Sequence, residues 1–135
     1  GRTLPENDLA WKHFRIKGLH IIIGTIYFDH TIGFTGPNHH KFNMAAHLTD
    51  NGKRMLILAG DFNMEPEEWD HQLLQSAGLQ IVTAGDEKTC KTSHGSKQND
   101  YIIVSIDLVP FLRNMKIDTD VPWAPHLGLS FEVDR

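Results

Sequence analysis

One segment constrains the fold of this chain more than any other: the stretch from Trp11 to Phe28, WKHFRIKGLHIIIGTIYF. Its first arm, residues 11–16, alternates apolar and polar side chains, and Lys17-Gly18 is a typical turn pair. Residues 19–28 are rich in β-branched and aromatic side chains. This pattern predicts a β-hairpin. The second arm is apolar at most positions, so we expect it to be buried on both faces of a sheet.

The rest of the chain alternates strands with two helices. Apolar and alternating patterns predict strands at residues 55–59, 79–83, 89–92, 99–108, 115–119 and 127–133. Helical spacing predicts one helix with Asn38 as its N-cap and Gly52 just past its end. It predicts a second helix that starts at Pro66 and stops at Gly78. Because several strands are hairpin-like neighbours, the fold class is α/β with a mixed sheet and outer helices.

Composition and charge restrict the function. A length of 135 residues indicates one domain, residues 1–135, and no apolar run reaches the ~18 residues that a membrane span needs. Cys90 is the sole cysteine, which excludes an internal disulfide and favours an intracellular location, in cytoplasm or nucleus. The net charge of −4 provides no bulk positive field for nucleic acid or an anionic membrane. Any phosphate ligand must therefore be bound locally, for example through a metal ion.

Polar residues capable of chemistry stand at the strand ends. The apolar strand at 55–59 runs into Gly60-Asp61-Phe62-Asn63, and a strand's carboxyl end commonly presents functional groups. Asp61 can orient or deprotonate a water, and Asn63 can donate to a phosphoryl oxygen. An Asp100–His126 pair would fix the imidazole tautomer and raise its pKa. Such a set suits hydrolysis at phosphorus, and Tyr27 ends the hairpin where it can join the others on one rim. Taken singly, each of these residues is more often a turn, cap or surface residue.

Together, these motifs resemble one family. The strings LILAGDFN followed by Pro66, then NDYIIVS, then a histidine that enters HLGLSFEV, look like the endonuclease/exonuclease/phosphatase superfamily with its DNase I-like fold. The resemblance implies a four-layered α/β sandwich of two packed, mostly antiparallel or mixed sheets with outer helices. It also implies divalent-metal-dependent cleavage of phosphoester bonds in nucleic acids, phosphoinositides or sphingomyelin, with Mg²⁺ or Mn²⁺ as the cofactor.

The same resemblance assigns roles to residues. Asp61 would position the nucleophilic water and serve as a metal ligand, and Asn63 would support the developing charge on phosphorus. His126, paired with Asp100, would bind or protonate the phosphate, and Tyr27 would contact the same group. Nucleic acid is the expected substrate.

Two departures from the family pattern stand out. The family carries an Asn on its first strand and a metal-binding Glu in a Gln-Glu motif on the next, and neither occurs upstream of the hairpin. The chain thus resembles the carboxyl-terminal portion of the fold, a partial domain truncated at its amino end. The family also has Ser-Asp-His where this chain has Ala124-Pro125-His126. We therefore expect weak or absent Mg²⁺ binding by this chain alone.

Three other interpretations stay open at this stage. A noncatalytic remnant or binding module, as in retroelement-derived copies, would keep the same sequence pattern, and a lipid or inositol phosphatase would share the core motifs. The nine histidines also raise a zinc hypothesis, because His40 and His47 are seven residues apart on one face of a predicted helix. No cysteine pair accompanies them at zinc spacing, so a solvated helix face is the simpler interpretation.

Overall fold

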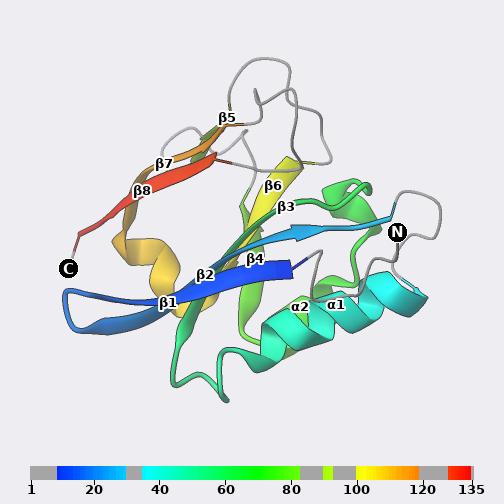
Figure 1. Cartoon of the computed structure of the whole chain (residues 1–135), viewed down its shortest axis with the longest axis horizontal. Helices are drawn as coiled ribbons and strands as arrows, with labels where there is room; N and C mark the ends of the chain where they lie inside the picture. Colours follow the sequence, from blue (N-terminus) through cyan, green and yellow to red (C-terminus); the bar gives the residue numbers. More distant parts are fainter. Residues whose placement is uncertain (1–8, 30–34, 83–89, 93–99, 119–127, 135) are drawn as a thin grey trace.

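The computed structural model describes residues 9–29, 35–82, 90–92, 100–118 and 128–134. These residues form eight strands, two α-helices and two 3₁₀-helices (Figure 1). The strands are β1 Leu9–Ile16, β2 Leu19–Tyr27, β3 Met55–Asp61, β4 Leu79–Val82, β5 Cys90–Thr92, β6 Asp100–Ser105, β7 Leu112–Asp118 and β8 Gly128–Val133. The helices are α1 Gly36–His47, η2 Pro66–Glu68, α2 His71–Ser76 and η3 Ile106–Phe111.

The larger sheet has five strands in the order β1-β2-β3-β6-β4. β1 and β2 form the expected antiparallel hairpin, with Leu9 opposite Ile26 and Ile16 opposite Leu19. Lys17 and Gly18 have φ values of 50° and 81°, as a type I′ turn requires. β2 runs parallel to β3, whereas β6 runs antiparallel to both β3 and β4. The sheet is therefore mixed, as the sequence pattern predicts.

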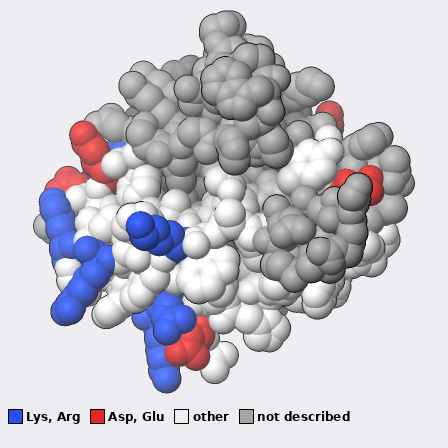
Figure 2. All heavy atoms as spheres, viewed as in Figure 1, with Lys and Arg blue, Asp and Glu red and all other residues white. Residues whose placement is uncertain are grey.

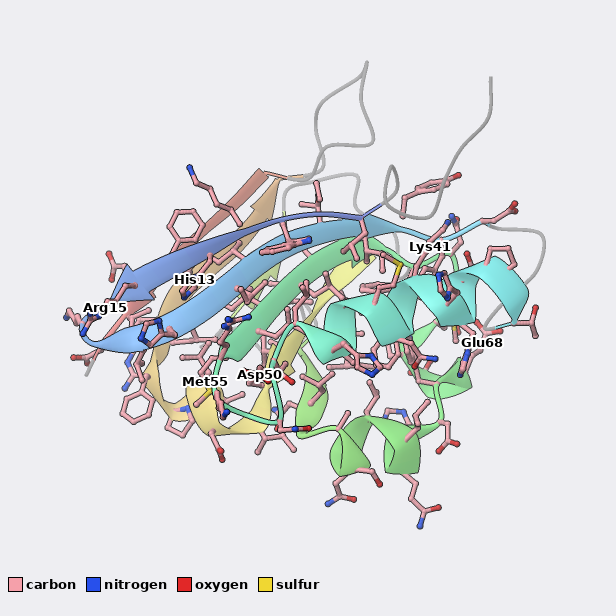
Figure 3. The ribbon with its side chains drawn as sticks, turned by 60° about the horizontal axis from the view of Figure 1, so that its bottom comes forward. His13, Arg15, Lys41, Asp50, Met55 and Glu68 are labelled. Carbon is pink, nitrogen blue, oxygen red and sulfur yellow. The ribbon has the colours of Figure 1, made fainter. Side chains whose placement is uncertain are left out.

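Both faces of the larger sheet are covered. One face packs against the helices, since Phe42 of α1 and Leu74 of α2 join a buried cluster with Ile22 and Leu58. Figure 3 shows α1 and α2 together on this side of the sheet. Residues of alternate parity, such as Ile21 and the other members of a second cluster, lie on the opposite face. β2 is thus buried on both sides, which confirms the expectation from its continuous apolar pattern.

The second cluster joins the two sheets. It combines Ile57 and Ile102 of the larger sheet with Leu112 of β7 and Val133 of β8. β7 is the middle strand of a three-stranded sheet in the order β5-β7-β8, in which β5 is parallel and β8 antiparallel to β7. The described residues therefore build a helical layer, a five-stranded sheet and a three-stranded sheet stacked on each other.

The two helices differ from their expected bounds. α1 begins at Gly36 with Thr35 as the N-cap residue, so Asn38 is not the cap. Asn38 is instead fully buried and hydrogen-bonded to Asp29, which is possible only because α1 packs against the end of β2. The predicted helix after Pro66 is split into η2 and α2, because the Asp70 side chain caps a new helix by accepting from the amides of Gln72 and Leu73.

Two further features complete the fold. The expected strand at 99–108 ends at Ser105 and continues as η3, with Ser105 Oγ accepting a 2.8 Å hydrogen bond from the amide of Leu56. Within the described part of the chain, no helix is long and apolar enough to cross a membrane.

Candidate functional site

Strand register brings three of the expected site residues into one line. Tyr27 is the register partner of Asp61 across the parallel β2–β3 pair, and Asp61 is the partner of Asp100 across the antiparallel β3–β6 pair. Neighbouring strands are about 4.8 Å apart, so the three backbone positions span about 10 Å across the end of the sheet where β2 and β3 finish. We call Tyr27, Asp61 and Asp100 the polar row. The backbone register places these three residues side by side, and the predicted convergence of their side chains stays a prediction.

The register row next to the polar row, one residue back along β2 and β3, leaves no room for a side chain at Gly60. Gly60 is the register partner of both Ile26 and Tyr101. A Cβ on Gly60 would lie 2.6 Å from Ile26 Cγ2, 2.8 Å from Phe62 Cζ and 2.9 Å from the Ile26 carbonyl oxygen. The backbone oxygen cannot move aside as a flexible side chain can. Glycine at this position therefore allows β2 and β3 to approach closely immediately before Tyr27 and Asp61.

An aromatic cluster supports the turn that follows Asp61. Phe62 is fully buried and stacks on Tyr101 with ring centroids 4.7 Å apart. The Tyr101 hydroxyl donates to the Met64 carbonyl at 2.8 Å and accepts from Trp69 Nε1 at 2.6 Å. These bonds tie β6 to Met64, just before η2, and to Trp69, just after it. They also satisfy polar atoms that burial would otherwise leave unpaired. The Gly60-Asp61-Phe62-Asn63 string is thus partly a packing motif, in which the buried Phe62 ring anchors the turn between Asp61 and Asn63.

Three side chains hold the backbone where β2 ends. Lys41 Nζ of α1 donates to the Tyr27 carbonyl at 3.0 Å, and Asn63 Nδ2 donates to the Phe28 carbonyl at 2.6 Å. Asn38 both accepts from the Asp29 amide at 2.8 Å and donates to the Asp29 carbonyl at 2.9 Å. We call Asn38, Lys41 and Asn63 the polar clamp. Because each contact comes from a different turn or helix position, the clamp fixes the exit of β2 relative to α1 and β3.

The sequence singles out only one member of the polar clamp as a site residue, since Asn38 is expected only as a helix N-cap. Asn63 has a φ of 48°, which Asn tolerates better than most residues, and one hydrogen of its amide is committed to Phe28. Its predicted role toward phosphate stays a prediction. Lys41 and Asn38 escaped prediction because their signal is burial: Lys41 is 4% exposed and Asn38 is 0% exposed on a short helix with polar neighbours. Figure 3 shows Lys41 on the side of α1 near the end of β2.

The clamp leads to a first prediction. Lys41→Met keeps the unbranched apolar stem of the side chain and removes the charged donor to the Tyr27 carbonyl, so we expect a loss of about 1.5–3 kcal/mol in the free energy of unfolding. Urea denaturation followed by far-UV circular dichroism measures this loss. Lys53→Met is the matched control, because Lys53 is exposed and should change stability by less than about 0.5 kcal/mol. Equal effects of the two substitutions would contradict a structural role for Lys41.

The remaining expectations concern His126, a metal-binding group and the histidines of α1. His126 lies outside the described residues, so its pairing with Asp100 stays a prediction. The described residues contain no group of three or more His, Cys, Asp or Glu side chains that could hold a metal ion. On α1, the His47 ring bonds the Asn43 carbonyl one turn back, and His39 contacts the Asn43 side chain. Both side chains therefore make contacts within their own helix.

On the face seen in Figure 2, Lys and Arg side chains gather toward one end of the molecule. In the space-filling view, the visible Lys and Arg side chains concentrate at the left and bottom, toward the turn between β1 and β2 (Figure 2). The polar row is at the other end of β2, where the strand leads into α1 (Figure 1). Near the polar row, the ammonium of Lys41 donates to the Tyr27 carbonyl.

Comparison with solved structures identifies the fold. The endonuclease domain of TRAS1, a telomere-specific non-LTR retrotransposon, matches with a TM-score of 0.62 and 22% identity over 94% of this chain and 64% of that chain. An endonuclease/exonuclease/phosphatase family protein from Leptotrichia buccalis matches with a TM-score of 0.60 and 17% identity, over 94% and 53% of the two chains. The human Nocturnin catalytic domain matches with a TM-score of 0.55 and 19% identity, over 91% and 52%.

This chain has the DNase I-like fold. The resemblance to the endonuclease/exonuclease/phosphatase superfamily is thereby confirmed at the level of fold. The chain spans between about half and two thirds of the length of these DNase I-like structures. Comparison of the sequence with protein-family models and with curated proteins gave no match.

Proposed function

We propose that this chain carries part of a divalent-metal-dependent phosphoester hydrolase of the endonuclease type, centred on the polar row. The observation that carries the proposal is the register of Tyr27, Asp61 and Asp100 at one edge of a DNase I-like sheet. Two acidic residues in adjacent register positions beside a tyrosine are an uncommon juxtaposition for a purely structural strand end, because like charges directly opposite each other destabilise a sheet. A phosphoryl-binding site at this position would account for that juxtaposition.

The donor types in the polar row fit a hard divalent cation. Mg²⁺ is usually held by one or two carboxylates together with substrate phosphate and water. Asp61 supplies one carboxylate, and Asp100 is its direct register partner. When bound, the metal would supply Lewis-acid polarisation of the phosphoryl oxygen. Asp61 would hold that metal, and Mn²⁺ would satisfy the same oxygen donors.

The chain's own residues would divide the remaining work. Asp61 orients the attacking water and withdraws its proton, while the hydroxyl of Tyr27 contacts a phosphate oxygen. Asn63 donates to the charge that develops on phosphorus. Asp100 fixes the tautomer of His126, which protonates or binds the phosphate. Precise placement matters because catalysis at phosphorus depends chiefly on positioning and charge stabilisation. The polar clamp holds the end of β2, with Lys41 bonded to the Tyr27 carbonyl and Asn63 to the Phe28 carbonyl.

Nucleic acid is the substrate class that the neighbours favour. The TRAS1 neighbour is described as a retrotransposon endonuclease, and this supports both a nucleic-acid substrate and a retroelement origin for the chain. The formal charge of −4 means that strand binding would depend on local contacts at the site. A noncatalytic protein of the same fold is the second candidate.

The proposal predicts metal-dependent cleavage. We expect the purified chain to nick supercoiled plasmid slowly in the presence of Mn²⁺ or Mg²⁺, and EDTA to abolish the nicking. Calorimetric titration of Mn²⁺ should show weak binding, since the polar row offers few carboxylates. A phospholipid and an inositol phosphate assayed alongside would separate the substrate classes. Absence of both Mn²⁺ binding and metal-dependent cleavage would reject the metal site at the polar row and favour the noncatalytic candidate.

A further inference from the structure

Two exposed histidines face each other across the β1–β2 hairpin. His13 Nε2 and His20 Nδ1 are 3.0 Å apart, and the ring centroids are 5.1 Å apart. The register pairs His13 with Ile22 and His20 with Arg15, so the two histidines are diagonal neighbours on the same face of the hairpin. Figure 3 shows His13 on β1 toward the hairpin turn. Neither histidine belongs to the polar row or to the polar clamp.

The hairpin holds the two histidines in place. Eight consecutive register pairs join β1 to β2, and Ile22, the partner of His13, is fully buried against the helical side of the sheet. The backbone positions of both histidines are therefore fixed by the core, and both rings are exposed at the surface. His20 is seven residues before Tyr27 on β2, which places it about 23 Å from the polar row.

The nitrogen pair has the chemistry of a metal chelate. In the hydrogen-bonded arrangement, one ring nitrogen donates a proton and the other accepts it, so two nitrogens converge on one small positive centre. Neutral imidazole nitrogens are preferred ligands of Zn²⁺, Ni²⁺ and Cu²⁺. Two nitrogens bound tetrahedrally at 2.0–2.1 Å from zinc are about 3.3 Å apart. The observed separation of 3.0 Å needs to open by only about 0.3 Å, accompanied by a turn of the rings.

We propose that His13 and His20 form a two-histidine binding site for a divalent transition-metal ion of borderline softness, such as Zn²⁺, Ni²⁺ or Cu²⁺. Water fills the remaining coordination positions, because no third His, Cys, Asp or Glu joins these two among the residues that the structure covers. Arg15 is the register partner of His20 and opposes the added charge, which limits the affinity. The bound ion would cross-link β1, the edge strand of the sheet, to β2.

The site differs in chemistry from the proposed phosphoester centre. Mg²⁺ and Ca²⁺ prefer oxygen ligands and should not bind a pair of imidazoles. Nickel binding at His13 and His20 can therefore be measured without any substrate, and its failure would leave the metal-dependent hydrolysis untouched. Conversely, loss of hydrolysis in the absence of Mg²⁺ or Mn²⁺ says nothing about the hairpin.

The test is a titration of the purified chain with Ni²⁺, followed by calorimetry and by the midpoint of thermal unfolding. We expect binding of one ion at this site and a rise in the midpoint that EDTA reverses, since an ion bound only by the native hairpin stabilises it. The midpoint measured with Mg²⁺ at the same concentration should shift equally in the parental chain and in the His13→Ala variant, since Mg²⁺ does not bind imidazoles. His13→Ala and His20→Ala should each weaken the binding by at least about tenfold, because loss of even an outer-shell partner of a metal ligand costs that much.

His47→Ala is the matched control, because His47 is an exposed histidine on α1 whose ring bonds its own helix. It should retain the parental affinity. Both hairpin histidines are exposed, so their alanine variants should unfold near the parental midpoint in the absence of metal. No midpoint shift in the parental chain, parental affinity in both hairpin variants, or an equal loss of affinity in His47→Ala would overturn the proposal.

Discussion

Asp61→Asn should lower the rate of metal-dependent phosphodiester cleavage by about 100-fold to 10,000-fold, the range expected for removal of a positioned general base. Asp61 is the middle residue of the polar row, with Tyr27 and Asp100 as its two register partners. Asparagine occupies nearly the same volume, so the packing around Gly60 and Phe62 is preserved while the carboxylate is lost. The measurement is the initial rate of plasmid nicking in Mn²⁺, with thermal unfolding to establish that the variant folds.

Asp107→Asn is the control for this substitution. Asp107 is an exposed acid in η3, on the segment that follows β6, and its loss should leave both the rate and the stability near the parental values. If the Asp61 variant nicked plasmid at the parental rate, the polar row would not be the catalytic centre. If it lost both activity and its cooperative unfolding transition, Asp61 would have a structural role at the end of β3.

Trp69→Ala should give the largest loss of stability, about 3–5 kcal/mol in the free energy of unfolding. Trp69 is 4% exposed and contacts three aromatic rings, with centroid distances of 5.8 Å to Phe28, 5.2 Å to Phe42 and 5.6 Å to Phe62. Truncation removes these contacts and leaves a cavity between α1 and the sheet. It also removes the indole donor that bonds the Tyr101 hydroxyl at 2.6 Å. Domains are stable by only about 5–15 kcal/mol, so this loss is a large fraction of the total.

The measurement is urea denaturation followed by near-UV circular dichroism, which reports the aromatic cluster directly. Trp11→Ala is the matched control, because Trp11 is 50% exposed on edge strand β1. It should cost less than about 1 kcal/mol. A Trp69 variant within about 1 kcal/mol of the parental chain would show that the cluster repacks around the missing ring, and that the turn after Asp61 has another support.

Local patterns determined much of this fold. The alternating arm 11–16, the turn at Lys17-Gly18 and the apolar arm 19–28 specify a hairpin, since each signal acts over a few neighbouring residues. Continuous apolar runs in β2 and β3 likewise specify strands that are covered on both faces. The sequence also located Tyr27, Asp61 and Asp100 at strand ends, and register partnership then followed from the order of these strands in the sheet.

Tertiary structure alone decided which polar residues support the site and which pair elsewhere. Lys41 and Asn38 look like surface residues of a polar helix, yet docking of α1 against β2 buries both and directs them to the backbone of Tyr27 and Asp29. The break after Pro66 depends on Trp69, which leaves the helical path to fill the aromatic cluster. The His13–His20 contact likewise arises only when the hairpin register brings residues seven apart together. The periodicity of a segment shows which of its faces is apolar and can be buried, whereas these contacts depend on which elements pack against each other.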